Sequence, residues 1–324
     1  MLVKKHIKPF TSSMIGWLGG KTKLRPTIIA CMPKHETYVE IFCGSATVFF
    51  GKSPEISKSE IINDVHCELV NLMKVLSGTY FDETIRQEFI GYVRNMPASR
   101  DVFEDWKHWE EDKLNSLTPA QRAFRFYYCV KKGFSSLPKG GYEASPFGSS
   151  RYNMSSDFDK ITARFRATNA QIERLDFREL IDKYSNSRAK TFFFGDPPYV
   201  VADGTNYYEH VFTQQDHQDL KECCDKIHKN KNQLLLTYDD DQEILDLYKD
   251  KHYYIYKTDP IVYSAMISEE RNEISKQELF VTNYSIEELF KKELRPRTID
   301  EINLPNKNDN RIEFENHISL TRIK

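Results

Sequence analysis

Residues 191–199 read Thr-Phe-Phe-Phe-Gly-Asp-Pro-Pro-Tyr, an unbroken apolar run followed at once by an acidic, proline-containing turn. A short apolar run that ends in turn residues is typical of a strand buried on both faces, as in a parallel sheet. Each proline fixes φ at about -65° and has no N–H group, so the turn presents acceptors. This stretch therefore predicts a central buried strand with a chemically equipped turn at its end.

The turn suits a reaction on an aromatic amine. Asp196 and the carbonyl of Pro197 can accept hydrogen bonds from an exocyclic amine, and Tyr199, held by the turn at Pro198, can stack on a flat heterocycle. An aryl amine is a poor nucleophile because its lone pair is delocalised into the ring, and two fixed acceptors favour the nucleophilic, pyramidal form. The turn predicts alkylation of an amino group on a base. The alternative is an ordinary turn with Asp as the turn residue.

A second motif lies at residues 37–49, which read Thr-Tyr-Val-Glu-Ile-Phe-Cys-Gly-Ser-Ala-Thr-Val-Phe. The pattern predicts a strand, a turn in which Gly44 lets the backbone approach a ligand, and the start of a helix. It lacks the glycine spacing of dinucleotide-binding proteins. Glu40 could pair with a cationic amino group, and Asp64, at the end of a second predicted strand, suits ribose hydroxyls. An amino acid and a ribose without phosphate describe S-adenosylmethionine.

The chain resembles the Dam-like, D12 class of DNA adenine-N6 methyltransferases over roughly residues 10–285. The matching segments occur in the family's order, and they are Trp17-Leu18-Gly19-Gly20-Lys21, Val39 to Ser45, Asn63-Asp64, Gly133-Phe134 with Pro146-Phe147-Gly148, and Asp196 to Tyr199. The resemblance implies an α/β fold, a Rossmann-like class I S-adenosylmethionine-dependent methyltransferase sheet. It also implies an inserted, mainly helical DNA-recognition domain that bears a hairpin.

The resemblance further implies roles for individual residues. The expected cofactor-binding residues are Trp17, Gly20, Lys21, Glu40, Phe42, Gly44, Ser45, Asp64, Asp176 and Phe177. Lys21 and Glu40 would lie near the methionine end, and Asp176 would accept from the adenine amine. The catalytic residues would be Asp196, Pro197, Pro198 and Tyr199. Because an adenine cannot be reached inside a duplex, it would be flipped out of the stack.

DNA recognition is expected in the hairpin between Lys131 and Arg151. Residues 120–166 hold nine Lys or Arg residues and three acidic residues, with aromatic side chains between them. The residues expected to contact DNA are Lys131, Lys132, Phe134, Ser135, Leu137, Lys139, Pro146 and Arg151. The family pattern implies GATC as the recognition sequence. Lys139, however, stands where the family has a guanine-reading Arg, and Lys lacks the bidentate fork; a phosphate contact is the alternative.

The expected organisation has three parts. These are a catalytic domain (10–84 and 169–288), a target-recognition domain (85–168) and a C-terminal appendage of unknown role (289–324). Within them the pattern predicts a first helix that carries Lys21, and a mobile loop over 264–276. The other expected elements are strands at 38–42, 60–63, 191–195 and 233–238, a strand and helix in 170–184, helices at 69–76 and 213–229, and an antiparallel pair at 253–258 and 278–284.

Composition bounds the remaining predictions. The net charge is -2 and hydrophobic residues make up 40% of the chain, with no apolar run of membrane-spanning length and no signal-peptide pattern. The six cysteines lack metal-type spacing, so we expect free thiols and no metal. We expect a cytoplasmic, nucleoid-associated enzyme of bacterial or phage type, monomeric or a weak dimer. Its partner would be double-stranded DNA, and a companion restriction nuclease is conceivable.

Three other functions fit parts of the pattern. The acceptor-rich turn would serve any exocyclic amine, so RNA or cytosine N4 are alternative substrates. A non-catalytic DNA-binding protein on the same scaffold is a second alternative, although the intact Asp196 and Tyr199 argue against it. A nucleotide-dependent oxidoreductase or kinase is disfavoured because the chain has neither a phosphate loop nor a dinucleotide fingerprint.

Overall fold

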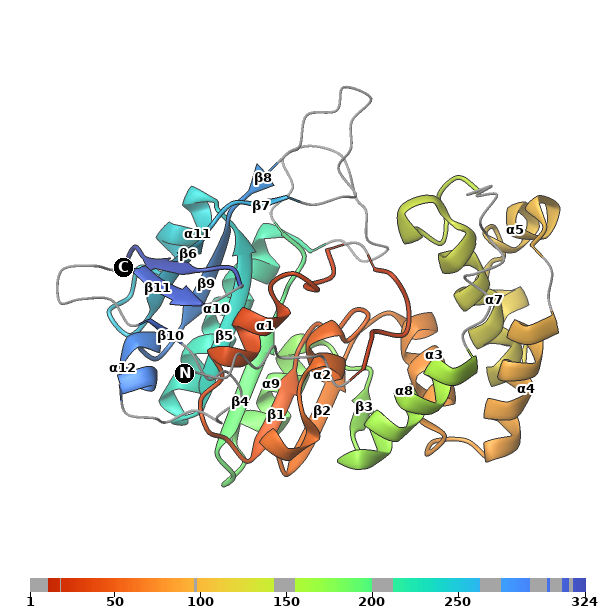
Figure 1. Ribbon diagram of the computed structural model, residues 1–324, viewed down its shortest axis with the longest axis horizontal. Helices are drawn as coiled ribbons and strands as arrows, with labels where there is room; N and C mark the ends of the chain where they lie inside the picture. Colours follow the sequence, from red (N-terminus) through yellow and green to blue (C-terminus); the bar gives the residue numbers. More distant parts are fainter. Residues whose placement is uncertain are drawn as a thin grey trace, which may run out of the picture.

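The protein is built around one large mixed sheet, seen in the centre of the computed structural model (Figure 1). The structure describes residues 11–17, 19–95, 98–142, 155–199, 212–262, 275–291, 302–303, 311–314 and 317–324. The strands in the described part of the chain are β1 (Thr37–Glu40), β2 (Ser59–Asn63), β3 (Gln171–Glu173), β4 (Thr191–Gly195), β5 (Gln233–Asp239), β6 (Tyr254–Thr258), β7 (Ile261–Val262), β8 (Ser275–Lys276), β9 (Glu278–Thr282), β10 (Ile302–Asn303), β11 (Arg311–Phe314) and β12 (Leu320–Arg322).

Helices flank this sheet and form a lobe beside it. They are α1 (Arg25–Ala30), α2 (Thr47–Gly51), α3 (Cys67–Ser77), α4 (Glu83–Asn95), α5 (Arg100–Trp106), α6 (Glu111–Asn115), α7 (Pro119–Lys132), α8 (Ser155–Ala167), α9 (Phe177–Ser185), α10 (Gln214–Lys229), α11 (Gln242–Leu247) and α12 (Ile286–Lys291). Two short 3-10 helices, η1 (Pro54–Ile56) and η2 (Phe134–Ser136), complete the described elements.

The strand order explains why the residues expected to be functional meet at one edge of the sheet. The order is β10-β11-β12-β6-β9-β5-β4-β1-β2-β3, and β3, β2, β1, β4 and β5 run parallel. β9 enters antiparallel between β5 and β6. The predicted α/β sheet and the antiparallel pair are both confirmed. Because parallel strands end at the same edge, the turns after β1, β2 and β4 are brought together.

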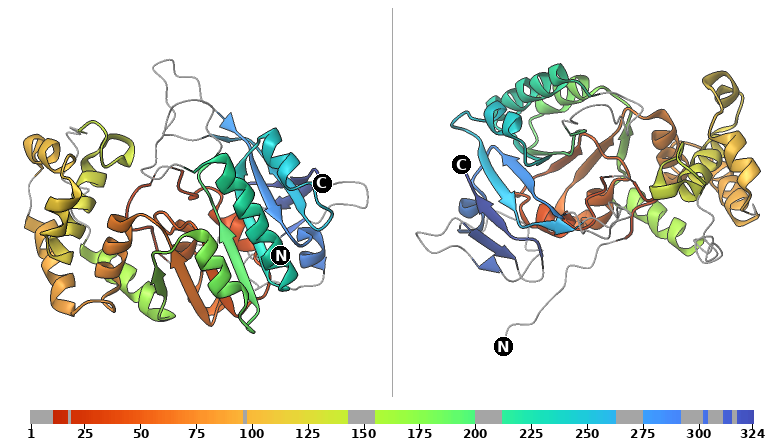
Figure 2. Two further views of the ribbon diagram at one scale, coloured as in Figure 1. Left: turned by 180° about the vertical axis from the view of Figure 1, so that it is seen from behind. Right: turned by 90° about the horizontal axis from the view of Figure 1, so that it is seen from above.

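Two apolar layers cover the sheet, one on each face. Successive side chains of a strand point to opposite faces. Phe192 and Phe194 accordingly join the core that contains α1 and α2, and Phe193 joins the core with α9, α10 and α11. The view from above separates the two helical layers (Figure 2). All residues of β4 are buried, as the apolar run predicts.

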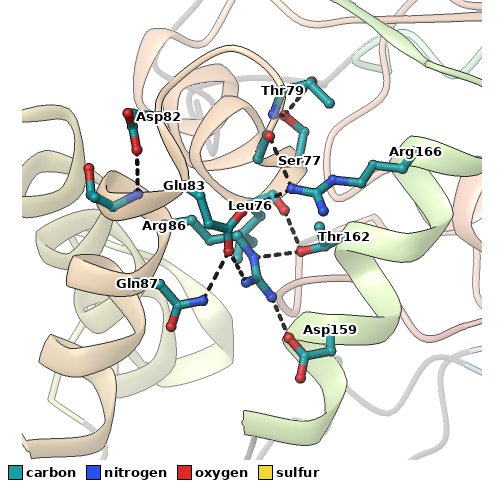
Figure 3. Close-up of polar contacts among 12 residues, drawn as sticks. Leu76, Ser77, Thr79, Asp82, Glu83, Arg86, Gln87, Asp159, Thr162 and Arg166 are labelled. Carbon is teal, nitrogen blue, oxygen red and sulfur yellow. Dashed lines mark hydrogen bonds and ion pairs between the residues drawn. The ribbon is translucent and has the colours of Figure 1, made fainter.

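The helical lobe lies beyond β3, at one end of the molecule (Figure 1). Arg86 of α4 is buried and donates to Glu83, to Asp159 and to the hydroxyl of Thr162 in α8. Thr162 in turn donates to the carbonyl of Leu76 in α3, so one buried guanidinium joins three helices (Figure 3). α8 and nearly all of α4 fall in the segment expected to recognise DNA (85–168), whereas α3 falls in the expected catalytic part, and the limits of both domains remain a prediction.

A second buried arginine ties the last helix of the lobe to the sheet. Arg164 of α8 makes two hydrogen bonds with Glu60 of β2, at 2.7 and 2.9 Å, and neither side chain is exposed. Its Nε donates to the carbonyl of Phe49, and the guanidinium lies over the Phe49 ring at 3.8 Å. Lys52 also pairs with Glu60. The lobe and the sheet therefore share one buried charge cluster.

Three local predictions need correction or extension. Lys21 does not lie on the first helix, because α1 begins only at Arg25, with Pro26 in the position where proline favours a helix start. Most of the predicted loop at 264–276 lies outside the described residues, and Ser275–Lys276 forms β8, paired with β7. The hairpin residues 143–154 also lie outside them, Pro146 and Arg151 included.

The C-terminal segment adds strands to the sheet. β12 pairs with β6 and β11 pairs with β12, both antiparallel. The ammonium of Lys324 donates to the carbonyls of Tyr248 and Asp250 at the end of α11. β11 and β12, which the sequence places in an appendage, thus cover the edge that β6 would otherwise leave open.

Two expectations from composition can be compared with the structure. All six cysteines are thiols outside any disulfide, as expected, and Cys31, Cys43, Cys129 and Cys224 are buried. In the described part of the chain, every helix is too short or too polar to cross a bilayer.

The buried Arg164–Glu60 pair predicts a large difference between two neighbouring arginines. Arg164→Ala leaves Glu60 buried beside Lys52 without its bidentate partner, so we expect unfolding to cost about 3–5 kcal/mol less than in the wild type. Arg166, half exposed and paired with Glu83, is the control, and its replacement should change stability by about 1 kcal/mol or less. Urea unfolding followed by circular dichroism measures both; equal losses for the two variants would contradict the prediction.

Candidate active site

A cavity of about 310 Å³ opens at the carboxyl edge of the parallel strands. It lies between the turns after β1, β2 and β4, the segment before α1, and the start of α9. All ten residues expected to bind a cofactor are in its lining, together with Asp196 and Pro198. The structure therefore brings together residues that are far apart in sequence, although their contact with a cofactor remains a prediction.

The loop after β1 needs glycine for two physical reasons. Gly44 has φ +47°, a conformation that favours glycine, and a Cβ added there would lie 2.9 Å from Cδ1 of Trp17. The N–H of Gly44 donates to Oδ2 of Asp64 at 2.9 Å, and Oδ1 of Asp64 accepts from the N–H of His66. Asp64 thus ties the turn after β1 to the turn after β2, and Trp17 packs on both.

Glu40 lies at the end of β1, only 2% exposed, in the cavity wall. Its Oε2 accepts from the Tyr38 hydroxyl at 2.8 Å and from the N–H of Phe49 at 3.1 Å. Burial raises the pKa of Glu40 to about 8, although these two hydrogen bonds oppose the shift. Near neutral pH the group is therefore mostly protonated, and pairing with a cationic amino group would require it to ionise.

Asn63, which precedes Asp64, fixes the opposite wall of the cavity. Its amide donates to the carbonyls of Ile41 and Leu175, and its oxygen accepts from the N–H of Leu175. The next residue, Asp176, caps α9 by accepting from the N–H of Arg178 and pairs with the Arg178 guanidinium at 3.0 Å. The segment from Leu175 to Phe177 is therefore held in place by the end of β2.

Asp196, directly after β4, is the centre of a compact polar cluster. Its Oδ1 accepts from the Thr237 hydroxyl at 2.7 Å and from the Tyr199 hydroxyl at 3.2 Å, and lies 2.9 Å from Nζ of Lys21. The Lys21 ammonium is also 4.8 Å from the centre of the Tyr199 ring and 3.6 Å from Glu278. Lys21, expected at the methionine end of the cofactor, thus contacts the turn that is expected to be catalytic.

Pro197 and Tyr199 are not in the cavity lining, unlike their neighbours Asp196 and Pro198. Tyr199 packs its ring against Tyr238 of β5, with 6.3 Å between centroids. The phenol donates to Oε2 of Glu278 at 3.0 Å. The ring is thus anchored at its hydroxyl end within the Asp196 cluster.

Sequence reasoning missed several residues of this site. Thr237 lies on β5, the strand next to β4, so its position could have been inferred from the strand order. Asn63 was visible beside Asp64, but nothing indicated that its amide would hold Leu175. Glu278 comes from β9, whose antiparallel insertion beside β5 has no local signal in the sequence.

The residues expected to contact DNA differ in their exposure to solvent. Phe134 is 65% exposed on η2, in a loop closed by the hydrogen bond from its N–H to the carbonyl of Gly141. Lys139 is exposed, whereas Leu137 and Lys131 are half-buried. Lys132 is only 7% exposed and lies on the face of α7 that packs into the core, so its expected contact with DNA stays a prediction that its burial disfavours.

The loop that carries Phe134 touches the segment leading to Lys21. A Cβ added at Gly16 would lie 2.3 Å from Oγ of Ser136. Lys107 braces the far side of the loop through the carbonyl of Gly140. The exposed aromatic ring is therefore carried by a loop that is packed against the active-site segment.

A group with metal-ligand chemistry lies away from this cavity. Ligand atoms of Asp225, Asp250 and His252 lie within 4.8 Å of one another. The ammonium of Lys221 pairs with both carboxylates. A cation of the protein itself therefore already balances this group.

The raised pKa of Glu40 predicts how stability depends on pH. Glu40 binds its proton more tightly in the folded than in the unfolded chain, so it contributes stability below pH of about 4.5 that is lost as pH rises to about 8. Glu40→Gln, a neutral isostere, should abolish this loss and be more stable relative to the wild type at pH 8 than at pH 5. Thermal unfolding at the two pH values measures the difference; a pH-independent difference would contradict the assignment.

Comparison with known proteins agrees with this geometry. The family model for the D12 class N6 adenine-specific DNA methyltransferase matches residues 17–262. The chain is 24% identical over 246 residues to a DNA adenine methylase of Vibrio cholerae, which covers 73% of this chain and 84% of the relative. It is 24% identical over 251 residues to the DNA adenine methylase of Escherichia coli K12, with 70% and 81% covered. A DNA N-6-adenine-methyltransferase of Escherichia phage P1 is 22% identical over 279 residues, which are 76% of this chain and 33% of that protein. The chain belongs to the D12 class of N6 adenine-specific DNA methyltransferases.

Proposed function

We propose that this DNA adenine-N6 methyltransferase takes its methyl group from S-adenosylmethionine and acts on an adenine flipped out of a short double-stranded sequence. One observation carries the proposal: a single cavity holds all ten expected cofactor residues and opens onto Asp196. The expected target-holding turn and the expected cofactor site thus share one space, as an in-line transfer requires.

The charge of the cavity supports this cofactor. Its lining contains five acidic side chains and one lysine, and these are Glu40, Asp64, Asp176, Asp196, Asp216 and Lys21. The carboxylates of this wall disfavour the phosphates of a dinucleotide or of ATP. The sulfonium and ammonium groups of S-adenosylmethionine are cationic, and a cation beside Glu40 would favour the ionised form of that residue, whose pKa burial raises to about 8. The volume lies within the range of about 300–1,000 Å³ that is usual for small-molecule sites.

Different residues of the cavity would bind different groups of S-adenosylmethionine. Glu40 would take the amino group, Asp64 the ribose hydroxyls, and the Phe177 ring would lie against the adenine. Val65, apolar and 46% exposed beside Asp64, offers a second contact for the base. When bound, the cofactor supplies a methyl group activated by the sulfonium.

The chain's own contribution to transfer is to hold the target amine. Asp196 and the carbonyl of Pro197 accept from N6, and the ring of Tyr199 stacks on the flipped base. Because Oδ1 of Asp196 already takes Thr237 and Lys21, we propose that Oδ2 faces the amine. The excess proton leaves after transfer, so positioning and electrostatics do most of the catalysis.

The recognition sequence is proposed to be GATC, read by the loop that carries Phe134 and Lys139. The exposed ring would enter the space left by the flipped adenine, and the Lys139 ammonium would contact guanine as a point charge. The enzyme would act as a monomer in the cytoplasm, since methylation of one base does not require a dimer.

Long-read sequencing of DNA from a methylation-free host that expresses the chain tests the proposal. One short motif carrying N6-methyladenine supports it, and GATC would show that Lys139 can replace the family's Arg. Modified cytosine instead of adenine, or methylation of RNA alone, would refute it. A restriction nuclease from the same organism that cleaves this motif only when it is unmethylated would be the companion enzyme of this methyltransferase.

The role of Asp196 predicts a separation between binding and turnover. Asp196→Ala removes the charged acceptor for N6, so kcat should fall by about 10²- to 10³-fold. Cofactor binding, measured by titration calorimetry, should stay largely intact because Lys21 keeps its contact with Glu278. Asp246→Asn, an exposed carboxylate on α11, is the control. Near-normal turnover of the Asp196 variant would show that the assignment is wrong.

The exposure of Phe134 predicts an effect on DNA without an effect on the fold. Phe134→Ala removes a stacking group, and we expect duplex binding to weaken by about 10- to 100-fold. Thermal stability and cofactor affinity should not change because the ring is largely exposed. Ile323→Ala, which removes another exposed apolar side chain at the opposite end of the sheet, should bind DNA normally. Fluorescence anisotropy with a labelled duplex measures both, and equal affinities would rule out the proposed contact.

A further inference from the structure

Glu278 is a buried acidic residue in the catalytic cluster that lies outside the residues matched by the family model. It begins β9, whereas the match ends at residue 262. Its side chain is 2% exposed, and its backbone N–H is fixed by the hydroxyl of Thr258 at 2.9 Å. Its carboxylate reaches the Tyr199 hydroxyl and the Lys21 ammonium. A buried carboxylate is costly, and this one is held against the two groups that also contact Asp196.

Asp196 and Glu278 compete for the same donors. The Tyr199 phenol has one proton and two acceptors, Oδ1 of Asp196 at 3.2 Å and Oε2 of Glu278 at 3.0 Å. Lys21 lies between the same carboxylates, at 2.9 and 3.6 Å. A phenol that donates to Glu278 does not occupy Asp196. The distribution of these protons therefore decides how strong an acceptor Asp196 is.

We propose that Glu278 is a positioning residue that draws the Tyr199 proton and part of the Lys21 charge away from Asp196. Asp196 then keeps its capacity to accept from the N6 amine of the target base. The same contact fixes the hydroxyl end of the Tyr199 ring, on which that base stacks. This inference rests on the proposed role of Asp196 as the acceptor for N6.

The competition predicts a rescue that a purely structural role does not. In Glu278→Gln a neutral amide is a weaker acceptor than a carboxylate, so the phenol proton moves to Asp196. In the double variant with Tyr199→Phe no phenol proton remains to move. Removing the hydroxyl should therefore restore activity in the Glu278→Gln background, although it removes another contact of the cluster.

Steady-state methylation of a duplex that contains the mapped motif measures this effect. We expect Glu278→Gln to lower kcat by about 10- to 100-fold while KM for DNA and for the cofactor changes little. The double variant should have a kcat several-fold above that of Glu278→Gln alone. Glu278→Asp keeps the charge but shortens the side chain, so it should retain more activity than Glu278→Gln. If the Glu278→Gln variant does not fold, the same rescue by Tyr199→Phe is measured in the Glu278→Asp background.

Glu287→Gln is the matched control. Glu287 is also a buried carboxylate that accepts from a tyrosine, Tyr256, at 2.6 Å, but it lies on α12, outside the cavity lining. Its replacement should alter thermal stability without altering kcat. A normal kcat for Glu278→Gln, or a double variant no faster than Glu278→Gln, would overturn the inference. A wild-type chain that methylates no adenine would instead refute the proposed function.

Discussion

The active site depends on one largely buried ion pair, between Lys21 and Asp196, whose side chains are 4% and 20% exposed. It joins the segment before α1 to the end of β4, and so closes one side of the cavity. The pair is largely removed from water, and its attraction offsets desolvation only because the ammonium also reaches Glu278 and the carbonyl of Gly19. These polar contacts of Lys21 hold the segment before α1 across the carboxyl edge of the sheet.

The buried Glu40 at the end of β1 and the partly exposed Asp196 directly after β4 meet different conditions in the same cavity. Asp196 has a cation and two hydroxyls as partners, whereas Glu40 has only the Tyr38 hydroxyl and one backbone N–H. Burial therefore raises the pKa of Glu40, and the nearby charge of Asp196 adds to the shift. A cationic ligand beside Glu40 would reverse this condition by favouring the ionised form. The cavity is thus electrostatically matched to a ligand with positive charge at one end.

The sequence predicted those parts of the molecule whose signals are local. The apolar run of β4, the threonine cap of α10 and the glycine turn after β1 each reflect contacts within a few residues. Lys21 was predicted to lie on the first helix, whereas α1 begins at Arg25, next to Pro26. Lys132 was assigned to DNA from charge alone, although the amphipathic face of α7 turns it inward.

Contacts between residues that are far apart in the sequence could not be predicted from such local signals. Glu278 reaches the site because β9 inserts antiparallel between β5 and β6, and Asn63 holds Leu175, which is distant in sequence. The sequence also contains no sign of the contact between the expected cofactor site and the expected DNA-reading loop. Trp17 contacts Gly44 in the loop after β1 and Phe126 in α7, the helix that leads into the loop carrying Phe134. Because packed interiors resist gaps, a ligand that displaced Trp17 would have to shift α7 as well. The wall expected to bind the cofactor and the loop expected to read DNA therefore belong to one packed unit, so a change in either is expected to affect the other.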